Sequence, residues 1–277
     1  MSDQSQPLHG RTVLVSGASR GIGAAIAVAA AEQGADVVLL AKTSEPHPRL
    51  PGTVHTVAAE VEGAGGRAAA VVGDVRKPED VARAVSVALE RFGGIDVCVH
   101  NAGAIATEPT EALSIKRFDL MHDINVRATF LLTTACLPAL RKSADPHVLS
   151  ISPPINLAPR WLGAHPAYTQ SKYAMTLLSQ GWAAEFDAAG IGFSCLWPQT
   201  YIATSAVAAL DNAADQLAAA RSPRIMADAA VAILGQPARS VTGQCFLDVE
   251  ALARFAGIDD FARYGGGPTP TRDLFVD

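Results

Sequence analysis

The amino-acid sequence predicts a single α/β domain built on a doubly wound parallel sheet with helices on both faces. Three observations lead to this prediction. Short apolar segments alternate with longer helical segments, which is the order expected of strand–helix–strand units. The apolar segments are continuous, as in strands that are covered on both faces. The chain has 277 residues, of which 49% are hydrophobic, so it can bury a large core.

Seven segments are expected to form the strands. They are Thr12–Ser16, Asp36–Ala41, Ala68–Val72, Ile95–His100, His147–Ile151, Gly192–Trp197 and Gln244–Val249. The helices that connect the first six strands are also visible, and the third carries a proline near its first turn, where proline is well tolerated. They are Ala24–Gln33, Thr53–Glu62, Pro78–Phe92, a long stretch from about Ile115 to Leu140, and a helix from near His165 to Gly190. Ala-rich helices are expected between the last two strands.

Two segments interrupt the alternation of strands and helices. Lys42–Gly52 contains three prolines and follows the second strand, so it is expected to be a loop. Gly265–Pro270 is rich in Gly and Pro and is expected to belong to a surface tail. The single domain is therefore expected to span residues 1–277, with residues 1–10 and 265–277 as tails.

Composition and charge argue against several classes of function. The net charge is -5 and Lys and Arg do not cluster, so nucleic acid is not expected as a partner. The polar Met1–Gly10 does not resemble a signal peptide, and no run of about 18 apolar residues could span a membrane. The four cysteines form no C-x-x-C pair and are expected to be reduced, buried thiols, as in a cytoplasmic protein. No metal site is expected.

A glycine-rich turn joins the first strand to the first helix. It reads Ser16-Gly17-Ala18-Ser19-Arg20-Gly21-Ile22-Gly23. Glycines permit a tight turn and the close approach of a pyrophosphate, while the helix N-terminus offers free N–H groups and a partial positive charge. A glycine-rich turn without a ligand is the alternative, but the strand before it and the helix after it favour a dinucleotide. The residues from Gly17 to Gly23 are therefore predicted to bind the cofactor.

The spacing G-x-x-x-G-x-G resembles that of the short-chain dehydrogenase/reductase family, whose fold is a Rossmann-type sheet. The resemblance extends from about Thr12 to Val249. It implies further cofactor-binding residues after the third, fourth and sixth strands. They are Asp74 and Val75 near the adenine, Asn101, Ala102 and Gly103 near the ribose, and Ile202 within Thr200–Ser205 over the nicotinamide carboxamide. His100 replaces the first Asn of the family's motif and is expected to be a hydrogen-bonded structural residue.

The end of the second strand predicts the choice between NAD and NADP. An NAD site usually places an acidic side chain there, bonded to the ribose 2′-hydroxyl. This chain has Ala41 followed by Lys42, with no acid. Arg20 and Lys42 could bind a 2′-phosphate through charge-assisted hydrogen bonds, although either alone could be a solvated surface cation. NADP is therefore the predicted cofactor.

Tyr168 and Lys172 lie four residues apart, so on a helix they share one face and can point at the same site. A phenol with its usual pKa near 10 is a poor acid at neutral pH, and the neighbouring ammonium is expected to lower that pKa. The same spacing also occurs by chance on ordinary amphipathic helices. Its position after the fifth strand, in a sheet with this phosphate loop, favours Tyr168 as the acid and base. Lys172 is expected to bond the nicotinamide ribose as well.

The resemblance implies two further catalytic positions. Asn125 would hold a water in a proton relay to Lys172, although an Asn inside a helix can also mark a kink or bond the backbone. The family follows its fifth strand with two serines, the second of which orients the substrate oxygen, but Pro153 stands at that position. Ser152 is the predicted donor if the loop re-aims it. Alternatively, Ser152 only bonds the strand end, and Asn156 acts.

A narrower resemblance lies in Ala41–Pro48, Ile151–Leu157 and Trp197–Thr200, which are similar to hydroxysteroid-dehydrogenase-like and citronellol/citronellal-dehydrogenase-like proteins. It implies a lipophilic alcohol, aldehyde or ketone as the substrate. The wider family resemblance implies a homodimer or a homotetramer. Three largely apolar segments are expected to line the substrate site. They are Ile105–Thr110, Leu157–His165 and Thr200–Leu217.

The predicted function is hydride transfer between NADP(H) and such a substrate. One alternative is a cofactor-binding sensor or scaffold with little turnover, which the missing serine would explain. The other is a redox-neutral reaction on the same fold, such as an epimerisation. Fold alone does not separate these three, because one fold supports many functions.

Overall fold

Seven parallel strands form one sheet in the order β3-β2-β1-β4-β5-β6-β7. The computed structural model describes residues 6–48, 50–209 and 212–277. The strands are β1 (Thr12–Ser16), β2 (Asp36–Ala41), β3 (Ala68–Val72), β4 (Val97–His100), β5 (His147–Ile151), β6 (Gly192–Trp197) and β7 (Cys245–Leu247). The chain runs outward from β1 to β3 and then returns to place β4 beside β1, so the predicted doubly wound sheet is confirmed. Ligands of such sheets bind beyond the carboxyl ends of the strands at this switch point.

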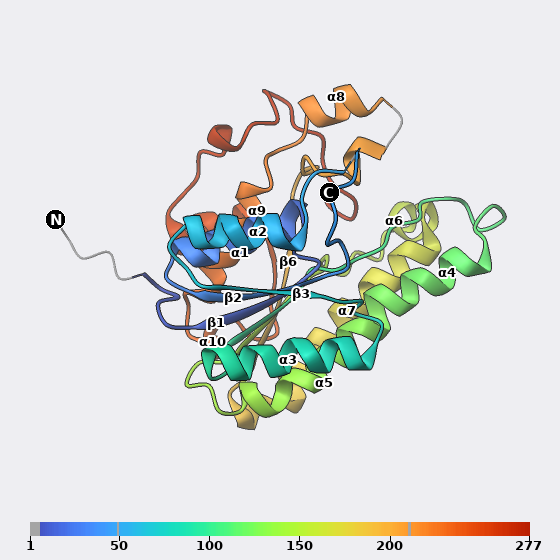
Figure 1. The fold of residues 1–277 in the computed structure, drawn as a ribbon. Coiled ribbons are helices and arrows are strands. Elements are labelled where there is room, and N and C mark those ends of the chain that lie inside the picture. The colour runs from blue at the N-terminus through green and yellow to red at the C-terminus, as the bar shows by residue number, and fades with distance from the viewer. Residues whose placement is uncertain (1–5, 49, 210–211) are drawn as a thin grey trace.

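Helices cover both faces of the sheet (Figure 1). They are α1 (Gly21–Glu32), α2 (Val54–Gly63), α3 (Pro78–Phe92), α4 (Ile115–Met121), α5 (Ala128–Leu140), α6 (Pro159–Ala164), α7 (Pro166–Glu185), α8 (Ala213–Ala218), α9 (Arg224–Leu234), α10 (Ala238–Val241) and α11 (Asp248–Ala251). Short 3₁₀ turns are η2 (Asp187–Ala189), η3 (Val207–Ala209) and η5 (Ala262–Tyr264). On one face α1 packs between α2 and α9, and on the other α3 packs on α5. The two apolar cores between helices and sheet fix the strand ends that form the site.

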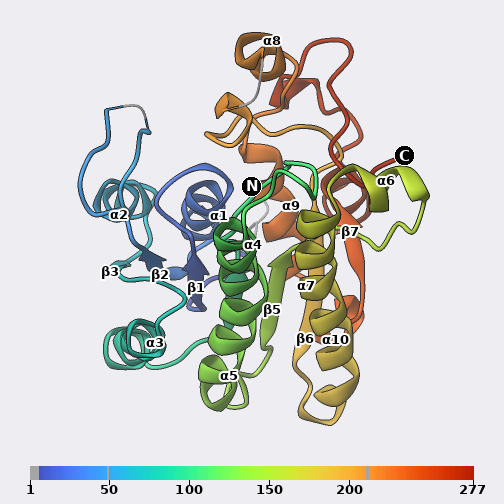
Figure 2. The same ribbon diagram turned by 90° about the vertical axis from the view of Figure 1, so that its right-hand side faces the viewer.

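The long helix expected from about residue 115 to residue 140 is not continuous. A π-helical turn, η1 (His122–Arg127), separates α4 from α5, and a second, η4 (Leu252–Ala256), follows α11. The three segments still run as one rod beside α7 (Figure 2). Within η1 the Asn125 side chain bonds the backbone of Ala104, and such single π turns often mark functional positions. The helical pattern could not reveal this, because a π turn preserves the run of helix-forming residues.

Both predicted tails need correction. Leu8 is fully buried and belongs to the core, although its described neighbours, residues 6, 7, 9 and 10, are exposed as expected of a tail, and residues 1–5 lie outside the described residues. Most of residues 265–270 are exposed, as expected. The residues after them fold back, and Phe275 and Val276 are only 3% and 7% exposed. The Phe275 ring lies against four other aromatic rings, which explains why the end of the chain leaves the surface. They are Trp161, Tyr168, Tyr173 and Trp197.

Several structural features bear on the expected class of protein. All four cysteines are free, and all but Cys245 are buried, as expected of packed thiols. Among the residues that the structure describes, no helix is both long and apolar enough to cross a membrane. Within the same part of the chain, no cluster of three or more His, Cys, Asp or Glu side chains is arranged to hold a metal ion.

Candidate active site

The glycine-rich turn sits tightly against the end of β4. Gly17 has a φ of 67°, and a Cβ built on it would lie 2.7 Å from the Ala102 Cα, so only glycine fits this position. The Ser16 hydroxyl accepts hydrogen bonds from the backbone N–H groups of Asn101 and Ala102, at 3.1 and 3.2 Å. The Asn101 amide in turn donates to the Gly17 carbonyl at 3.1 Å. These contacts hold the ends of β1 and β4 together.

The start of α1 leaves backbone donors available for an anion. Helix α1 begins at Gly21, three residues earlier than expected, and no side chain caps its N-terminus. The free N–H groups and the helix dipole suit a pyrophosphate. A groove of about 320 Å³ beside this helix is lined by residues from the ends of β1 to β4. It includes nine of the predicted cofactor-binding residues, namely Gly17, Ser19, Arg20, Lys42, Asp74, Val75, Asn101, Ala102 and Gly103.

The cations beside this groove already have protein partners. Arg20 donates to the carbonyls of Pro51 and Gly52 at 3.2 and 3.0 Å. Lys42 lies 3.7 Å from the Asp74 carboxylate and remains 59% exposed. Sequence reasoning missed Arg76, whose guanidinium bonds both Asp74 oxygens and holds the pKa of that carboxyl at about 2. Three cations therefore gather near the ends of β2 and β3. Because each already contacts a protein group, fewer of their N–H donors are available to a phosphate than their residue types suggest.

Tyr168 and Lys172 lie one turn apart on α7, which begins at Pro166, and both are buried. The Lys172 ammonium donates to the Ile151 carbonyl at 2.5 Å and lies 5.2 Å from the centre of the Trp197 ring. Burial lowers the pKa of Lys172 to about 8. Burial also raises the pKa of Tyr168, and the nearby Asp273 carboxyl raises it further. The pKa of Tyr168 is therefore raised overall and not lowered as expected, because desolvation of the phenol outweighs the effect of the neighbouring ammonium.

Tyr168 lies in the wall of a second, mostly apolar cavity of about 360 Å³. Ile22 and Ile202, which were both predicted to bind the cofactor, also line this cavity. Because Ile22 belongs to the phosphate loop, the cavity adjoins that loop. The three segments that were expected to line the substrate site contribute unequally to this cavity. Ile105 and Thr107 come from the first, and several residues between 201 and 207 come from the third, in which residues 210–211 lie outside the described residues. The segment 157–165 contributes only His165, because most of it forms α6 instead of a lining loop.

Asn125 is buried and fully occupied by hydrogen bonds. Its oxygen accepts from the Ala104 N–H at 2.8 Å, while its amide donates to the Ala104 carbonyl and to the Ser171 hydroxyl, each at 2.9 Å. Because Ser171 precedes Lys172 on α7, Asn125 ties the loop after β4 to the helix that carries Lys172. The backbone bonds that an Asn inside a helix can signal are present, and the helix forms a π turn at this residue.

The two candidates for the serine role lie away from the cavity. The Ser152 hydroxyl donates to the Lys172 carbonyl at 2.9 Å and lies 2.6 Å from the Thr176 hydroxyl. Asn156 bonds the Tyr173 hydroxyl through its backbone and the Phe275 carbonyl through its amide. Neither residue lines the cavity that holds Tyr168. The structure therefore favours the interpretation that Ser152 bonds backbone groups, and it gives Asn156 a structural position too.

His100 is the structural residue that the sequence suggests. Its side chain is 2% exposed, and its Nε2 lies 2.8 Å from the Thr133 hydroxyl. Burial lowers the pKa of His100 to about 3, so the ring is neutral at physiological pH. It serves to pack β4 against α5 and not to exchange protons.

Asp273 is the polar residue of this cavity that sequence reasoning missed. It lies just before Phe275, in the segment that folds back onto the core, and it lines the cavity with Tyr168. Burial raises the pKa of Asp273 to about 7. No local motif surrounds it, and only the burial of the following Phe-Val pair brings it here. The signal in the sequence that could have indicated this burial is the apolar pair Phe275-Val276, which follows a Gly/Pro-rich segment.

Comparison with known proteins gives consistent similarities. The family model for short chain dehydrogenases matches residues 11–215. Hydroxysteroid dehydrogenase-like protein 2 of Danio rerio is 46% identical over 268 residues, which is 97% of this chain but only 64% of that protein. A crystal structure of a short chain dehydrogenase from Mycobacterium thermoresistibile is 45% identical, with 98% and 96% of the two chains covered and a TM-score of 0.91. A more distant one from Mycobacterium paratuberculosis, bound to NAD, is 25% identical over 87% and 97%, with a TM-score of 0.74.

Proposed function

This chain belongs to the short-chain dehydrogenase family, and from that premise we propose that it transfers hydride between NADP(H) and a lipophilic alcohol, aldehyde or ketone. One observation carries the proposal. A buried phenol, Tyr168, lies in the wall of an apolar cavity beside the phosphate loop, with a buried ammonium one helical turn away. A proton donor next to a cofactor groove is what the reduction of a carbonyl requires.

The residues of the chain have separate parts in this reaction. The backbone N–H groups at the start of α1 hold the pyrophosphate, and the nicotinamide supplies the hydride when the cofactor is bound. Tyr168 gives its hydroxyl proton to the carbonyl oxygen. Lys172, which is mostly charged below its pKa of about 8, stabilises the phenolate that results. The apolar walls exclude water, which strengthens both effects.

Asn125 supports this arrangement through its hydrogen bond to Ser171 on α7. We propose that it acts in the proton relay through Lys172, as the family resemblance implies. Its bond to Ser171 lies next to Lys172 in the sequence, and its bonds to Ala104 fix the loop beside the cofactor groove. A loose loop here would displace the substrate by a fraction of an ångström, which is enough to slow the reaction.

The preference for NADP rests on the charges at the ends of β2 and β3. Ala41 occupies the position where an acid would bond the ribose 2′-hydroxyl, and Arg20 and Lys42 line the same groove. The relative from M. paratuberculosis is bound to NAD, so family membership alone does not decide the cofactor. Arg76 neutralises Asp74, which lessens the repulsion between that carboxylate and a 2′-phosphate.

The lipophilic substrate rests on the cavity and on the relatives. Ile105, Ile151 and Val207 are among the apolar residues that line the cavity. The chain is similar to hydroxysteroid dehydrogenase-like protein 2 and spans less than two thirds of the length of that protein. From this similarity we propose a steroid or related lipid as the class of substrate. The four free cysteines suit a reducing compartment such as the cytoplasm.

A homodimer or homotetramer is the assembly that we propose. Phe130 on α5 and Leu177 on α7 are large apolar side chains that are 52% and 60% exposed. A second copy of the chain would cover them. Light scattering of the purified chain would show a monomer if this is wrong.

Spectrophotometry with both reduced cofactors tests the main proposal. We expect NADPH to be consumed with at least one aliphatic or steroid carbonyl from a panel of aldehydes and ketones, and slower consumption of NADH. Tight NADPH binding without consumption on the whole panel would favour the sensor or scaffold. Conversion of a substrate to an isomer without net consumption would favour a redox-neutral reaction.

A further inference from the structure

Asp273 is held in place by backbone contacts on both sides. Its N–H donates to the Gln199 carbonyl at 3.1 Å, and the carbonyl of the next residue, Leu274, accepts from the Trp197 indole at 2.9 Å. These bonds fix the end of the chain against the segment that follows β6. The Asp273 side chain consequently forms part of the wall that also contains Tyr168.

The two oxygens of the Asp273 carboxyl differ in their hydrogen bonding. Oδ1 accepts a hydrogen bond from the Leu274 N–H at 2.6 Å. Oδ2 has no hydrogen-bond partner among the described residues. The other described residues that line the cavity include no Asp or Glu, and most of them are apolar. An oxygen without a partner that borders a substrate cavity is free to meet a polar atom of the substrate.

The surroundings favour the protonated form of this carboxyl. Burial raises the pKa of Asp273 to about 7, the neighbouring Asp248 raises it as well, and Lys172 opposes them. A neutral carboxyl has an O–H group to donate, whereas a carboxylate can only accept. A carboxylic acid that an apolar site keeps neutral is able to donate a hydrogen bond to a reacting oxygen.

Tyr168 is the donor that the proposed function assigns to the substrate oxygen, and the described lining of the cavity also includes the hydroxyls of Tyr201 and Thr204. The hydroxyl of Ser152 is bonded to the backbone and to Thr176, and the amide of Asn156 bonds the C-terminal residues. We propose that Asp273 donates a hydrogen bond to the substrate oxygen, in the role that the family resemblance would assign to a serine after β5. This inference rests on the proposed function, and it makes Asp273 a catalytic residue of that reaction.

The second donor would stabilise the negative charge that grows on the substrate oxygen during reduction. A donor of this kind typically contributes about 10²–10³ in turnover. Turnover should therefore fall as Asp273 loses its proton above about pH 7. Titratable or charged groups surround Asp273 on the elements that pack against it. They are Tyr168 and Lys172 on α7, Asp248 on α11, Tyr201 after β6, and His165 at the start of α7.

Two substitutions at this position separate a donor from a structural role. Asp273→Ala should lower turnover by at least about 10²-fold, with cofactor dissociation constants within about three-fold of the wild type. Asp273→Asn keeps a donor of the same size and should retain turnover within about five-fold. In the wild type, turnover should decline above about pH 7, where Asp273 loses its proton. In Asp273→Asn, the decline should begin nearer pH 8, where Lys172 titrates. Asp277→Asn, an exposed carboxylate of the same segment, is the matched control and should behave as the wild type.

A measurement without turnover completes the test. Infrared spectroscopy of bound acetophenone reports hydrogen bonding to its carbonyl, because donors lower the stretching frequency. Asp273→Ala should lose a shift that Ser152→Ala retains. Full activity of Asp273→Ala beside an inactive Tyr168→Phe would overturn the inference and leave the proposed function standing. Loss of activity in Asp273→Asn equal to that in Asp273→Ala would also overturn it. Absence of turnover in the wild type would instead count against the proposed function, while the infrared shift still decides the role of Asp273.

Discussion

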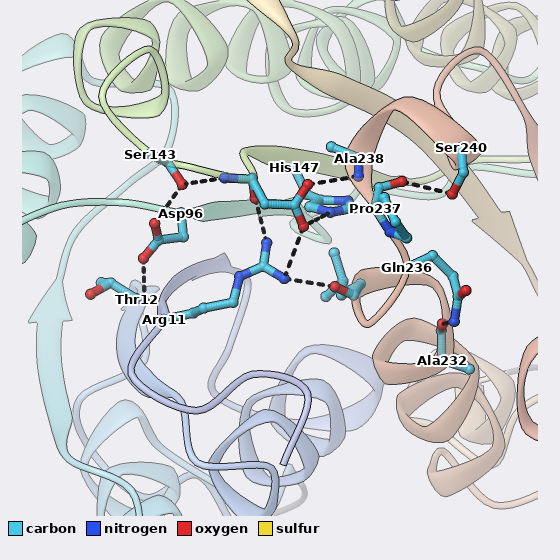
Figure 3. Close-up of polar contacts among 12 residues, drawn as sticks. Arg11, Thr12, Asp96, Ser143, His147, Ala232, Gln236, Pro237, Ala238 and Ser240 are labelled. Atoms are coloured by element: carbon cyan, nitrogen blue, oxygen red, sulfur yellow. Dashed lines mark hydrogen bonds and ion pairs between the residues drawn. The ribbon is translucent and has the colours of Figure 1, made fainter. Parts of the chain in front are cut away.

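At the amino-terminal ends of the strands, partly buried charges bond one another and the backbone (Figure 3). Arg11 donates to the carbonyls of Leu234 and Asp145 at 2.7 and 2.6 Å. The Asp96 carboxylate accepts from the Thr12 N–H and from the Ser143 hydroxyl at 2.8 and 2.5 Å. These contacts join the starts of β1, β4 and β5 to the end of α9. The polar groups here stabilise the sheet.

At the carboxyl-terminal ends, the buried charges have fewer partners. Lys172 donates to one carbonyl and approaches one thioether, and the Asp273 Oδ2 has no hydrogen-bond partner among the described residues. Burial shifts the pKa values of Lys172, Tyr168 and Asp273 toward their neutral forms. The polar groups at one end of the sheet therefore serve its stability, while those at the other end have the shifted pKa values that are common at functional sites.

The largest effect is expected where Lys172 is replaced. Lys172→Met should lower turnover by at least about 10²-fold and weaken cofactor binding, because the ammonium supports both. The free energy of unfolding should change by less than about 1 kcal/mol, since relief of the buried charge offsets the lost bond to Ile151. Turnover assays beside urea denaturation check this. A strongly destabilised variant would show that this end of the sheet is structural after all.

The opposite pattern is expected at Arg11. Arg11→Met leaves two carbonyls and part of the Asp145 carboxylate without their donor, which should cost about 2 kcal/mol of stability. Turnover at a temperature where the variant is folded should stay within about two-fold. Arg239→Met, which breaks an exposed pair with Asp187, is the control and should cost less than about 0.5 kcal/mol. A fall in turnover greater than the loss of folded protein would contradict the division between the two ends.

The smallest effect is expected at the cofactor groove. The wild type should bind NADP(H) at least ten-fold more tightly than NAD(H), or about 1.4 kcal/mol. Ala41→Asp should reverse part of this preference, because the new carboxylate repels a 2′-phosphate and can bond a 2′-hydroxyl. Titrations of both cofactors at one salt concentration measure it. Equal or inverted affinities in the wild type would contradict the assignment of NADP.

Much of the sheet could be predicted from the sequence. The seven strands of the sheet have the expected bounds within two residues, because continuous apolar runs between turn residues are a strong local signal. The grouping of Gly17, Asp74 and Asn101 in one groove also follows, since parallel strands end at the same edge of a sheet. Tyr168 and Lys172 were expected to share a helix face, and both lie buried on α7.

What could not be predicted depends on contacts between distant segments. The partners of Ser152 lie on α7, some twenty residues away, and no spacing rule connects them. The partners of Arg20 are backbone carbonyls of a loop, which residue types do not reveal. Asp273 is held at the cavity by the packing of Phe275 among four aromatic rings and by backbone hydrogen bonds to the segment that follows β6. A Gly/Pro-rich segment carries no local signal of such a return.

The most direct test of the account is the NADPH-dependent reduction of a lipophilic carbonyl by the wild type and by Tyr168→Phe. The substitution removes one hydroxyl and keeps the ring that packs against Phe275, so fold and cofactor binding should stay nearly intact. Turnover should fall by at least about 10²-fold, the low end for lost acid–base catalysis. A Tyr168→Phe variant that keeps most of its activity on every accepted substrate would contradict the central claim that this phenol supplies the proton.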